Sequence, residues 1–289
     1  MNEAAERIVE DLHWSSDGCS TITGPLLEWL DRFDAHIVEL ATGRGAAAYR
    51  FPSLIAAGSL APIAYLRSFP HLATFVTTGN RGEASLKALA ADAGTADRIH
   101  IDDGQFEDIG HLLTPATCYH FYPLFAGQQL DGPLMLTARC QCFRCEERYV
   151  PLERQWCFEM REVVCIGDAD SAAAFAGTWS SIMAELASSL GISAGFETAT
   201  DPFFDPTGDP KALAQLIEPS KEELCIPSGL AIGSVNKHRS FFGESYRIGS
   251  GSAAAHSACV AFGLERWLSA MLEVHGPDAS TWPVPGDRQ

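Results

Sequence analysis

The chain has 289 residues, of which 46% are hydrophobic and 20% charged, a composition typical of a soluble globular protein with one large domain or two small ones. The formal net charge of −17 argues against a broad nucleic-acid-binding surface, because such a surface neutralises phosphates with Lys and Arg. We find no apolar run of 18 residues and no signal peptide, so we expect no membrane span and place the protein in the cytoplasm. Nine cysteines, an odd number in such a compartment, argue against a disulfide framework.

The N-terminal part of the sequence is predicted to be mainly helical. Between Pro25 and Leu40, apolar side chains recur with a period close to 3.6, and two glycines then end the pattern. We therefore expect residues 1–45 to be helical and residues 1–49 to form an N-terminal extension. In chain order, a short helix, a buried strand and two surface helices are then predicted over residues 54–57, 74–78, 81–93 and 102–113.

The middle and C-terminal parts are predicted to be rich in strands. Residues 134–143 and 156–166 form two apolar β segments joined by a charged loop, and a helix over 172–190 with Asp170 or Ser171 as its cap follows them. Four more strands and a last helix are expected over residues 194–200, 222–226, 229–236, 245–249 and 257–274. Because these strands do not alternate regularly with helices, we predict an α+β fold with a mostly antiparallel sheet flanked by helices.

Two charged residues near the end of the first long strand suggest a nucleotide site. Residues two apart on a strand point to the same face, so Arg144 and Glu146 are expected to project together. An arginine can bind a phosphate with its forked guanidinium, a carboxylate can accept from the adenine amino group, and Phe158 could stack on the base. For these residues alone, a surface hairpin with a cross-strand ion pair is an equally good interpretation.

Two further patterns are weak when taken alone. Arg266 follows Gly263 closely at the start of a helix, where it could hold a terminal phosphate, although such a pair is more often structural. Cys140, Cys142 and Cys145 have the spacing of a metal knuckle, but no second cluster follows them. We interpret these cysteines as structural, because a free cysteine often behaves as a small buried hydrophobic residue.

Taken in order, these segments resemble motifs 2 and 3 of the class II aminoacyl-tRNA synthetases: Phe-Arg-x-Glu, a loop, Arg-x-x-x-Phe, and a late Gly-Leu-Glu-Arg on a helix. Other segments narrow the resemblance to the amino acid:carrier protein ligases, bacterial relatives of the atypical, zinc-containing seryl-tRNA synthetases. These segments are 65–70, 118–123, 160–164, 201–204 and 256–259. The resemblance extends from about Arg50 to Leu272 and implies one class II synthetase-like catalytic domain over residues 1–289 that forms a homodimer.

The resemblance implies a Zn²⁺ site. Its ligands correspond to Cys118, Glu162 and Cys259, and three protein ligands leave a fourth position open, as in catalytic zinc sites, for the amino group of an amino acid. Glu159 is a nearby competitor for the carboxylate position. We prefer Glu162 because the family's ligand lies in an Arg-Glu-Val register, and strand positions three apart face opposite sides unless a bulge intervenes.

The resemblance also implies a site for ATP with Mg²⁺ and for the amino acid. By the motif correspondence, Arg144 contacts the α-phosphate and Arg266 the γ-phosphate. Glu146 contacts the adenine amino group, and Phe158 stacks on the adenine ring. Ser234 and Asn236 share one face of a strand that lines the substrate pocket in the family. The acidic magnesium ligand of ordinary synthetases is not evident, since Ala231 falls near its place, and we interpret His238 and His256 as structural.

The implied function is the activation of glycine or alanine as an aminoacyl-adenylate, followed by transfer to the phosphopantetheine thiol of a carrier protein. We expect no tRNA substrate, because only about 45–50 residues precede the core and the long helical arm of a seryl enzyme would need more. The alternatives are a seryl-type aminoacyl-tRNA synthetase, a non-catalytic regulator that binds aminoacyl-adenylate, and a zinc-binding adaptor built on the cysteine run.

Overall fold

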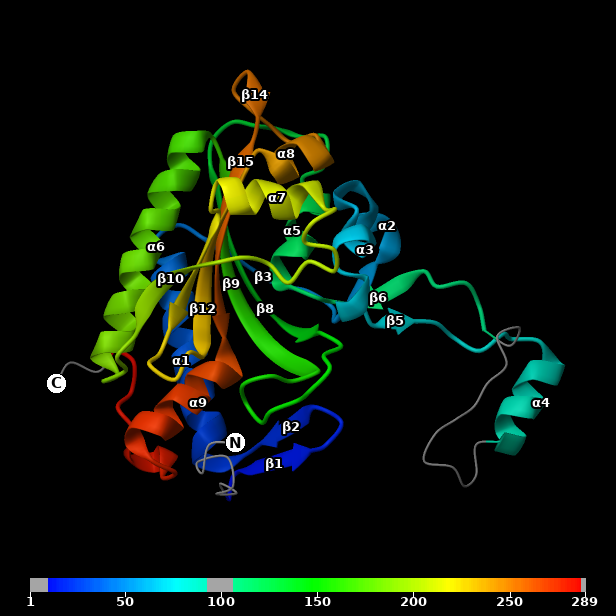
Figure 1. Cartoon of the computed structure of the whole chain (residues 1–289), viewed down its shortest axis with the longest axis horizontal. Helices are drawn as coiled ribbons and strands as arrows, with labels where there is room; N and C mark the ends of the chain where they lie inside the picture. Colours follow the sequence, from blue (N-terminus) through cyan, green and yellow to red (C-terminus); the bar gives the residue numbers. More distant parts are fainter. Residues whose placement is uncertain (1–9, 93–105, 287–289) are drawn as a thin grey trace.

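A seven-stranded sheet forms the centre of the computed structural model, which describes residues 10–92 and 106–286 (Figure 1). The strands are β3 (Ala47–Arg50), β8 (Leu134–Phe143), β9 (Cys157–Gly167), β10 (Gly195–Ala199), β11 (Lys221–Cys225), β12 (Ala231–Arg239) and β15 (His256–Gly263). They lie in the order β10-β11-β12-β15-β9-β8-β3. All neighbours pair antiparallel except β3 and β8, which pair parallel. The predicted α+β fold with a mostly antiparallel sheet is confirmed.

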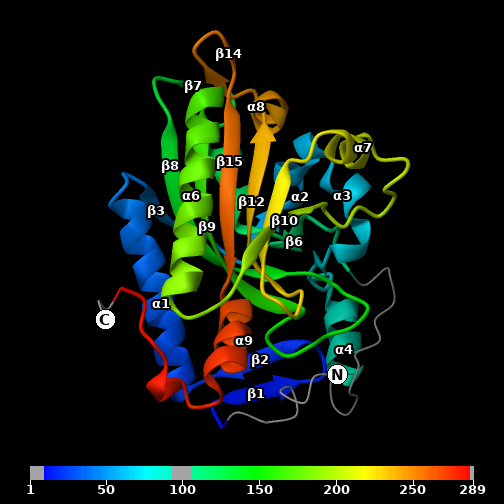
Figure 2. The same cartoon turned by 60° about the vertical axis from the view of Figure 1, so that its left-hand side comes forward.

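Three long helices cover one face of the sheet: α1 (Gly24–Thr42), α6 (Ala169–Ser189) and α9 (Leu264–His275). Figure 2 shows α1 and α6 side by side on this face. Apolar residues of α1, including Phe33 and Ile37, are fully buried and pack with Trp179 of α6 and Trp267 of α9. Asp168 caps α6, since its carboxylate accepts from the Ser171 amide at 2.7 Å, so the cap lies earlier than predicted.

Short elements cover the opposite face and enclose a second hydrophobic core. Alternate residues of β9 belong to the two cores, so that Val163 faces α6 while Val164 faces the short elements. The elements on this side are β4 (Leu54–Ala56), α2 (Ala57–Leu60), η2 (Ala61–Ile63), α3 (Tyr65–Ser68), η3 (Pro70–Leu72), β5 (Phe75–Val76), β6 (His111–Leu113), η5 (Thr117–His120), α5 (Phe121–Leu124) and α8 (Phe241–Tyr246).

The remaining elements lie at the margins of the sheet. A hairpin of β1 (Leu12–Ser15) and β2 (Cys19–Ile22) precedes α1, and β7 (Gln129–Leu130), β13 (Gly249–Ser250) and β14 (Ala253–Ala254) form a small sheet. α7 (Pro210–Ile217) follows β10, and η6 (Ala279–Thr281) follows α9. α4 (Glu83–Asp92) lies away from the central sheet (Figure 1).

Several predicted elements are wrong. The segment 1–45, predicted to be helical, contains the β1–β2 hairpin before α1. The predicted N-terminal extension, residues 1–49, includes most of β3, a strand of the central sheet. Residues 1–9 lie outside the described residues. The predicted helix over 257–274 is β15 followed by α9, because a central strand buried on both faces is continuously apolar and lacks the alternation of a half-buried strand. Three other assignments are wrong. The predicted helix at 54–57 is β4 followed by the start of α2, and the predicted strand at 245–249 overlaps the end of α8. The predicted helix at 102–113 ends in a strand, β6, in its described part.

The long β and α segments of the middle are confirmed. β8 has the predicted bounds, β9 differs from its prediction by one residue at each end, and α6, β10, β11 and β12 lie where strands and a helix were predicted. Among the residues that the structure describes, no helix is both long and apolar enough to cross a membrane.

Candidate active site

A cavity of about 510 Å³ opens on the face of the sheet that the short elements cover. It extends from η5 and β9 to the start of α9, so that it is bounded by segments far apart in the sequence. All nine residues predicted for the site line it: Cys118, Arg144, Glu146, Phe158, Glu162, Ser234, Asn236, Cys259 and Arg266. The fold therefore gathers one set of side chains from η5, from the segment after β8, and from β9, β12, β15 and α9 around a single space.

Three buried side chains at one end of the cavity are arranged as metal ligands. The Sγ atoms of Cys118 and Cys259 and a carboxylate oxygen of Glu162 all lie within 4.8 Å of one another. Cys118 comes from η5, while Glu162 and Cys259 lie on the neighbouring strands β9 and β15. Cys259 is opposite Val164, so it is the diagonal neighbour of Glu162 on the same face of the sheet.

The electrostatics of this cluster fit a bound cation. The Cys118 amide donates to Glu162 Oε1 at 3.1 Å, whereas the buried Oε2 has no hydrogen-bond partner among the described residues. Burial raises the pKa of Glu162, and a hydrogen bond to Cys259 together with burial raises the pKa of Cys118 well above its ordinary value. The hydrogen bond from Cys118 lowers the pKa of Cys259, but burial and Glu162 outweigh it and raise that pKa overall. A divalent cation would favour the charged forms of all three groups and give the orphan oxygen a partner.

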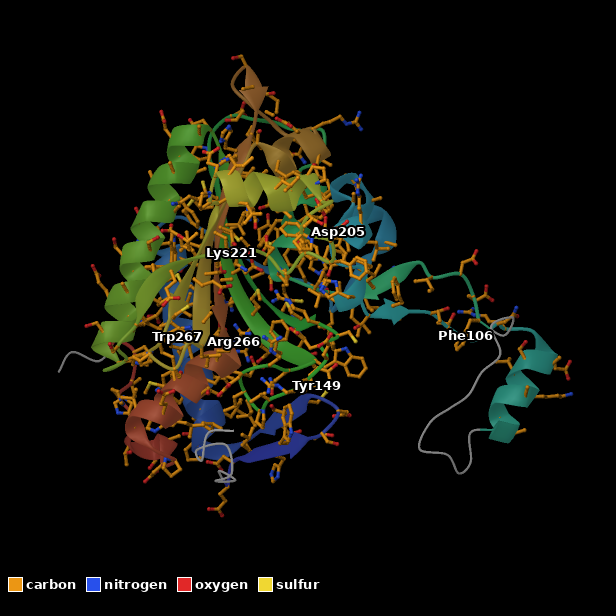
Figure 3. The ribbon with its side chains drawn as sticks, viewed as in Figure 1. Phe106, Tyr149, Asp205, Lys221, Arg266 and Trp267 are labelled. Carbon is orange, nitrogen blue, oxygen red and sulfur yellow. The ribbon has the colours of Figure 1, made fainter. Side chains whose placement is uncertain are left out.

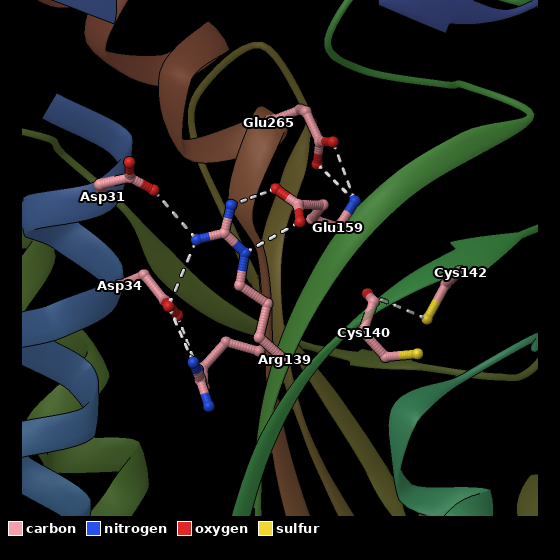
Figure 4. Close-up of polar contacts among 8 residues, drawn as sticks. Asp31, Asp34, Arg139, Cys140, Cys142, Glu159 and Glu265 are labelled. Atoms are coloured by element: carbon pink, nitrogen blue, oxygen red, sulfur yellow. Dashed lines mark hydrogen bonds and ion pairs between the residues drawn. The ribbon is translucent and has the colours of Figure 1, made fainter. Parts of the chain in front are cut away.

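Glu159, the competing carboxylate, faces the other side of the sheet. It pairs with Arg139 of β8, which also reaches Asp34 of α1 at 3.4 Å (Figure 4). Asp34 in turn accepts two hydrogen bonds from Arg161, at 2.6 and 2.7 Å. Strand alternation thus separates Glu159 from the cavity and directs Glu162 into it, as the sequence predicts.

The run of cysteines on β8 is not part of the metal cluster. Cys140 and Cys142 are buried in a small apolar cluster with Met160, and Cys145 is exposed. Among the described residues, Cys118, Glu162 and Cys259 are the only group of at least three His, Cys, Asp or Glu side chains close enough together to hold one metal ion.

The residues predicted for the nucleotide lie at the middle and the other end of the cavity. The Arg144 guanidinium lies 5.1 Å from the centre of the Phe158 ring, and its Nε donates to the Pro115 carbonyl at 3.2 Å. Arg144 and Glu146 follow the end of β8 rather than lying within it, and Glu146 pairs with Arg154 at 2.7 Å. Both nevertheless line the same cavity, so Arg144 and Phe158 form a cationic and aromatic wall.

Arg266 is anchored in the first turn of α9. Its Nε donates to the Glu153 carbonyl at 2.8 Å and its NH1 group to the Ala231 carbonyl at 2.9 Å. Burial, together with the positive charge of Arg144, lowers the pKa of Arg266. Two arginines in one partly enclosed cavity make a site that favours a polyanion such as a triphosphate.

Ser234 and Asn236 lie on β12 beside the metal cluster. Asn236 Nδ2 donates to Ser234 Oγ at 3.1 Å and to Cys259 Sγ at 3.5 Å. His238, two residues further on, also lines the cavity, and burial lowers its pKa to about 4. These polar groups are in reach of an amino acid that occupies the metal end of the cavity.

Lys221, Asp201 and Glu223 form an ion cluster in the cavity wall that the sequence did not indicate. Lys221 Nζ lies 3.1 Å from Asp201 and 3.0 Å from Glu223, and Figure 3 shows it above Arg266. Burial raises the pKa of Asp201, but Lys221 and Gln215 outweigh it and lower that pKa overall. In the sequence, Lys221 begins a Lys-Glu-Glu run that is typical of a solvated strand end, so neither Lys221 nor Glu223 stood out as a site residue. Asp201 belongs to the Asp-Pro-Phe-Phe segment of the family resemblance, which was the only sign of this cluster.

Comparison with known proteins identifies the family. No protein-family model matches the chain. Amino acid–(acyl-carrier-protein) ligase 1 of Bradyrhizobium diazoefficiens is 35% identical over 250 residues, which are 83% of this chain and 75% of the relative. Ligase 2 of the same organism is 34% identical over 81% of this chain and 72% of the relative.

The chain belongs to the amino acid–(acyl-carrier-protein) ligase family. It is therefore a ligase, and the resemblance that the sequence motifs indicated is confirmed. The fold of this ligase is that of the class II aminoacyl-tRNA synthetases. M. kandleri SerRS, solved in complex with A. aeolicus tRNASec, superposes with a TM-score of 0.81 and 18% identity over 99% of this chain. The match covers 62% of that chain.

A second neighbour is a seryl-tRNA synthetase from Pyrococcus horikoshii, solved in complex with ATP. It superposes with a TM-score of 0.68 and 12% identity over 94% of this chain and 57% of its own. At these identities the two neighbours show the fold alone, while the family rests on the ligases.

Proposed function

We propose that this ligase activates glycine or alanine with ATP and transfers the aminoacyl group to the phosphopantetheine thiol of a carrier protein. The observation that carries the proposal is the convergence of the metal cluster and the two arginines on one cavity in a member of this ligase family. In the first step the amino acid carboxylate attacks the α-phosphorus of ATP, and the bond to pyrophosphate breaks. In the second step the carrier thiol loses its proton and attacks the acyl carbon, and AMP leaves.

The first step requires positioning and charge neutralisation more than covalent help from the protein. We assign the α-phosphate to Arg144 and the γ-phosphate to Arg266, both of which act as catalytic residues, while Glu146 accepts from the adenine amino group and Phe158 stacks on the ring. Mg²⁺ accompanies ATP. Arg144 already lies over Phe158, which supports adjacent positions for the base and the α-phosphate.

We assign Zn²⁺ to Cys118, Glu162 and Cys259. Two thiolates and a carboxylate suit zinc, which accepts sulfur and oxygen ligands together, and three protein ligands leave one position for a substrate. When bound, the ion supplies a Lewis-acidic position that takes the neutral amino group of the substrate and orients it. Ser234 and Asn236 then contact the amino acid from β12. The partnerless Oε2 of Glu162 supports this ligand set.

The carrier protein is proposed to dock at the mouth of the cavity through a basic patch of Lys237 and Arg239. Both side chains line the cavity and are 48% and 42% exposed, and an acidic carrier would compete for them with their present partners, Glu222 at 2.9 Å and Glu218 at 2.7 Å. Carrier proteins are usually acidic, so a local patch can attract one despite the net charge of −17. Arg239→Glu is expected to slow transfer and leave adenylation intact, and an equal loss in both steps would refute this docking patch.

We also propose a cytoplasmic homodimer over a single catalytic domain. The proposal rests on the way class II cores pair and is an analogy at the level of the fold. β3, the edge strand of the central sheet, has three exposed residues out of four and is available for pairing. Sedimentation velocity tests it, since a monomer at micromolar concentration would contradict the proposal.

The decisive test of the function is thioester formation on a carrier protein. The enzyme is incubated with ATP and radiolabelled glycine or alanine, together with a carrier that bears phosphopantetheine or the same carrier without it. We expect label that hydroxylamine releases, on the modified carrier only. Charging of total tRNA instead would favour a seryl-type synthetase, and binding of adenylate without turnover would favour a regulatory homologue.

A further inference from the structure

Two side chains of β12 lie within hydrogen-bond distance of one of the three metal-binding groups. Asn236 lies directly opposite Cys259 in the β12–β15 pairing, and its Nδ2 is 3.5 Å from the Cys259 sulfur. The Nε2 atom of His238, on the same face of β12, is 3.6 Å from that sulfur. In the described part of the chain, the hydrogen bonds from side-chain N–H groups to the cluster go to the Cys259 sulfur and not to the Cys118 sulfur. The two sulfur atoms of the cluster therefore differ in their surroundings.

The neighbours of His238 determine which of its ring nitrogens carries the proton. Nδ1 lies 3.2 Å from the Tyr122 hydroxyl and 3.2 Å from Ser257 Oγ, and either hydroxyl can donate to it. If Nδ1 carried the proton, the lone pair of Nε2 would face the lone pairs of a Cys259 thiolate. A sulfur that is bound to a metal can only accept, so the loaded site fits the tautomer in which Nε2 donates to sulfur and Nδ1 accepts from a hydroxyl.

The ring of His238 is held in place by packing. Phe242 stacks on Tyr122 with ring centres 3.8 Å apart and meets the imidazole edge-on at 4.7 Å. Tyr122 and Ser257 are almost completely buried, at 0% and 1% exposure. The imidazole is thus fixed on two sides, and its direction toward the sulfur does not depend on solvent.

We propose that His238 and Asn236 are positioning residues that donate hydrogen bonds to the Cys259 sulfur and lower its electron donation to the metal. The inference rests on the metal site of the proposed function and gives His238 a role beyond packing. Two N–H···S bonds withdraw electron density from one ligand, so the bound ion keeps more of its positive charge for the amino group of the substrate. Cys118, without such donors, remains the stronger donor of the two.

Cobalt substitution tests this proposal without relying on turnover. Co²⁺ bound by thiolates shows a sulfur-to-metal charge-transfer absorption, whose energy falls as the sulfur becomes richer in electrons. His238→Phe removes the donor and keeps an aromatic ring, and we expect its band to move to longer wavelength. His238→Gln keeps an N–H donor at a similar reach and is expected to restore most of the wild-type position.

A double variant tests the tautomer argument at a distance from the metal. Tyr122→Phe with Ser257→Ala removes both hydroxyls that can donate to Nδ1, so Nδ1 loses its partners while Nε2 keeps its proton and its sulfur acceptor. We expect the band of this double variant to stay close to its wild-type position, and a shift as large as that of His238→Phe would contradict the tautomer argument. Metal affinity, measured by competition with a chromophoric chelator, is expected to fall about 10- to 100-fold in His238→Phe, the range for loss of a residue that hydrogen-bonds a metal ligand.

The outcomes separate the inference from the proposed function. A wild-type protein that binds no Co²⁺ or Zn²⁺ would overturn the metal site and this inference together. The inference alone would be overturned if the cobalt charge-transfer band of His238→Phe had the same position as that of the wild type. It would also be overturned if the band of His238→Gln moved as far as that of His238→Phe. If His238→Phe fails to fold by near-ultraviolet circular dichroism, Asn236→Ala replaces it, and an unchanged band there would contradict the proposal as well.

Discussion

Glu265 is a buried carboxyl group that should make the stability of the protein depend on pH. It lies in the first turn of α9 and is 6% exposed, and both of its oxygens accept from the Glu159 amide, at 2.8 and 3.0 Å (Figure 4). Burial raises its pKa from 4.5 to about 8, and the nearby Glu159 carboxylate acts in the same direction. We expect Glu265→Gln to remove this pH dependence, since glutamine keeps an acceptor oxygen and cannot ionise.

The sign and size of the effect follow from proton linkage. The folded protein holds this proton with a pKa of about 8 and the unfolded chain with one near 4.5, so the contribution to stability is complete below pH 4.5. It is lost as the pH rises to about 8. Each pH unit in this window is worth about 1.36 kcal/mol, which amounts to about 5 kcal/mol over the whole window.

Urea unfolding of both proteins at several pH values measures the effect. The free energy of unfolding of Glu265→Gln, relative to wild type, is expected to rise between pH 5 and pH 8 by about 1.4 kcal/mol per pH unit. Glu273→Gln, at an exposed position of the same helix, is the matched control and should show no such trend. A difference between Glu265→Gln and wild type that stays constant from pH 5 to pH 9 would refute the reasoning.

Three further predictions concern the charge network, the metal and the phosphates. Asp34→Ala leaves Arg161 buried and unpaired, so the free energy of unfolding in urea should fall by about 3–5 kcal/mol, and a loss below about 1 kcal/mol would contradict this. Cys118→Ser should lose bound zinc by elemental analysis while Cys142→Ser keeps it, and the reverse result would favour a metal site on the β8 cysteines. Arg266→Gln should lower the rate of adenylate formation about 100- to 1000-fold in single-turnover experiments, and a rate close to wild type would remove Arg266 from the site.

The sequence predicted best those elements that have one buried face or a long helical period. β8 was predicted to the residue, and strand alternation correctly separated Glu162 from Glu159. β15 was missed because all six residues from Ser257 to Phe262 are buried, and a strand covered on both faces shows no alternation. The β1–β2 hairpin was missed because four-residue strands give too short a pattern.

In the site, the motifs indicated which residues gather at the cavity but not how each is held. The anchoring of Arg266 by the carbonyls of Glu153 and Ala231 could not be predicted, since any residue type carries a backbone oxygen. His238 was interpreted as structural, although it lies 3.6 Å from the Cys259 sulfur, because a histidine signals no role until its neighbours on other strands are known.

Amino acid-dependent exchange of pyrophosphate into ATP measures whether this protein activates an amino acid at a metal site. All twenty amino acids are measured with the untreated enzyme, with enzyme stripped by a chelator, and with stripped enzyme to which zinc is returned. Exchange with glycine or alanine is expected to disappear on stripping and to return with zinc. Exchange that survives complete removal of the metal, or its absence with every amino acid for the folded, zinc-loaded protein, would contradict this expectation.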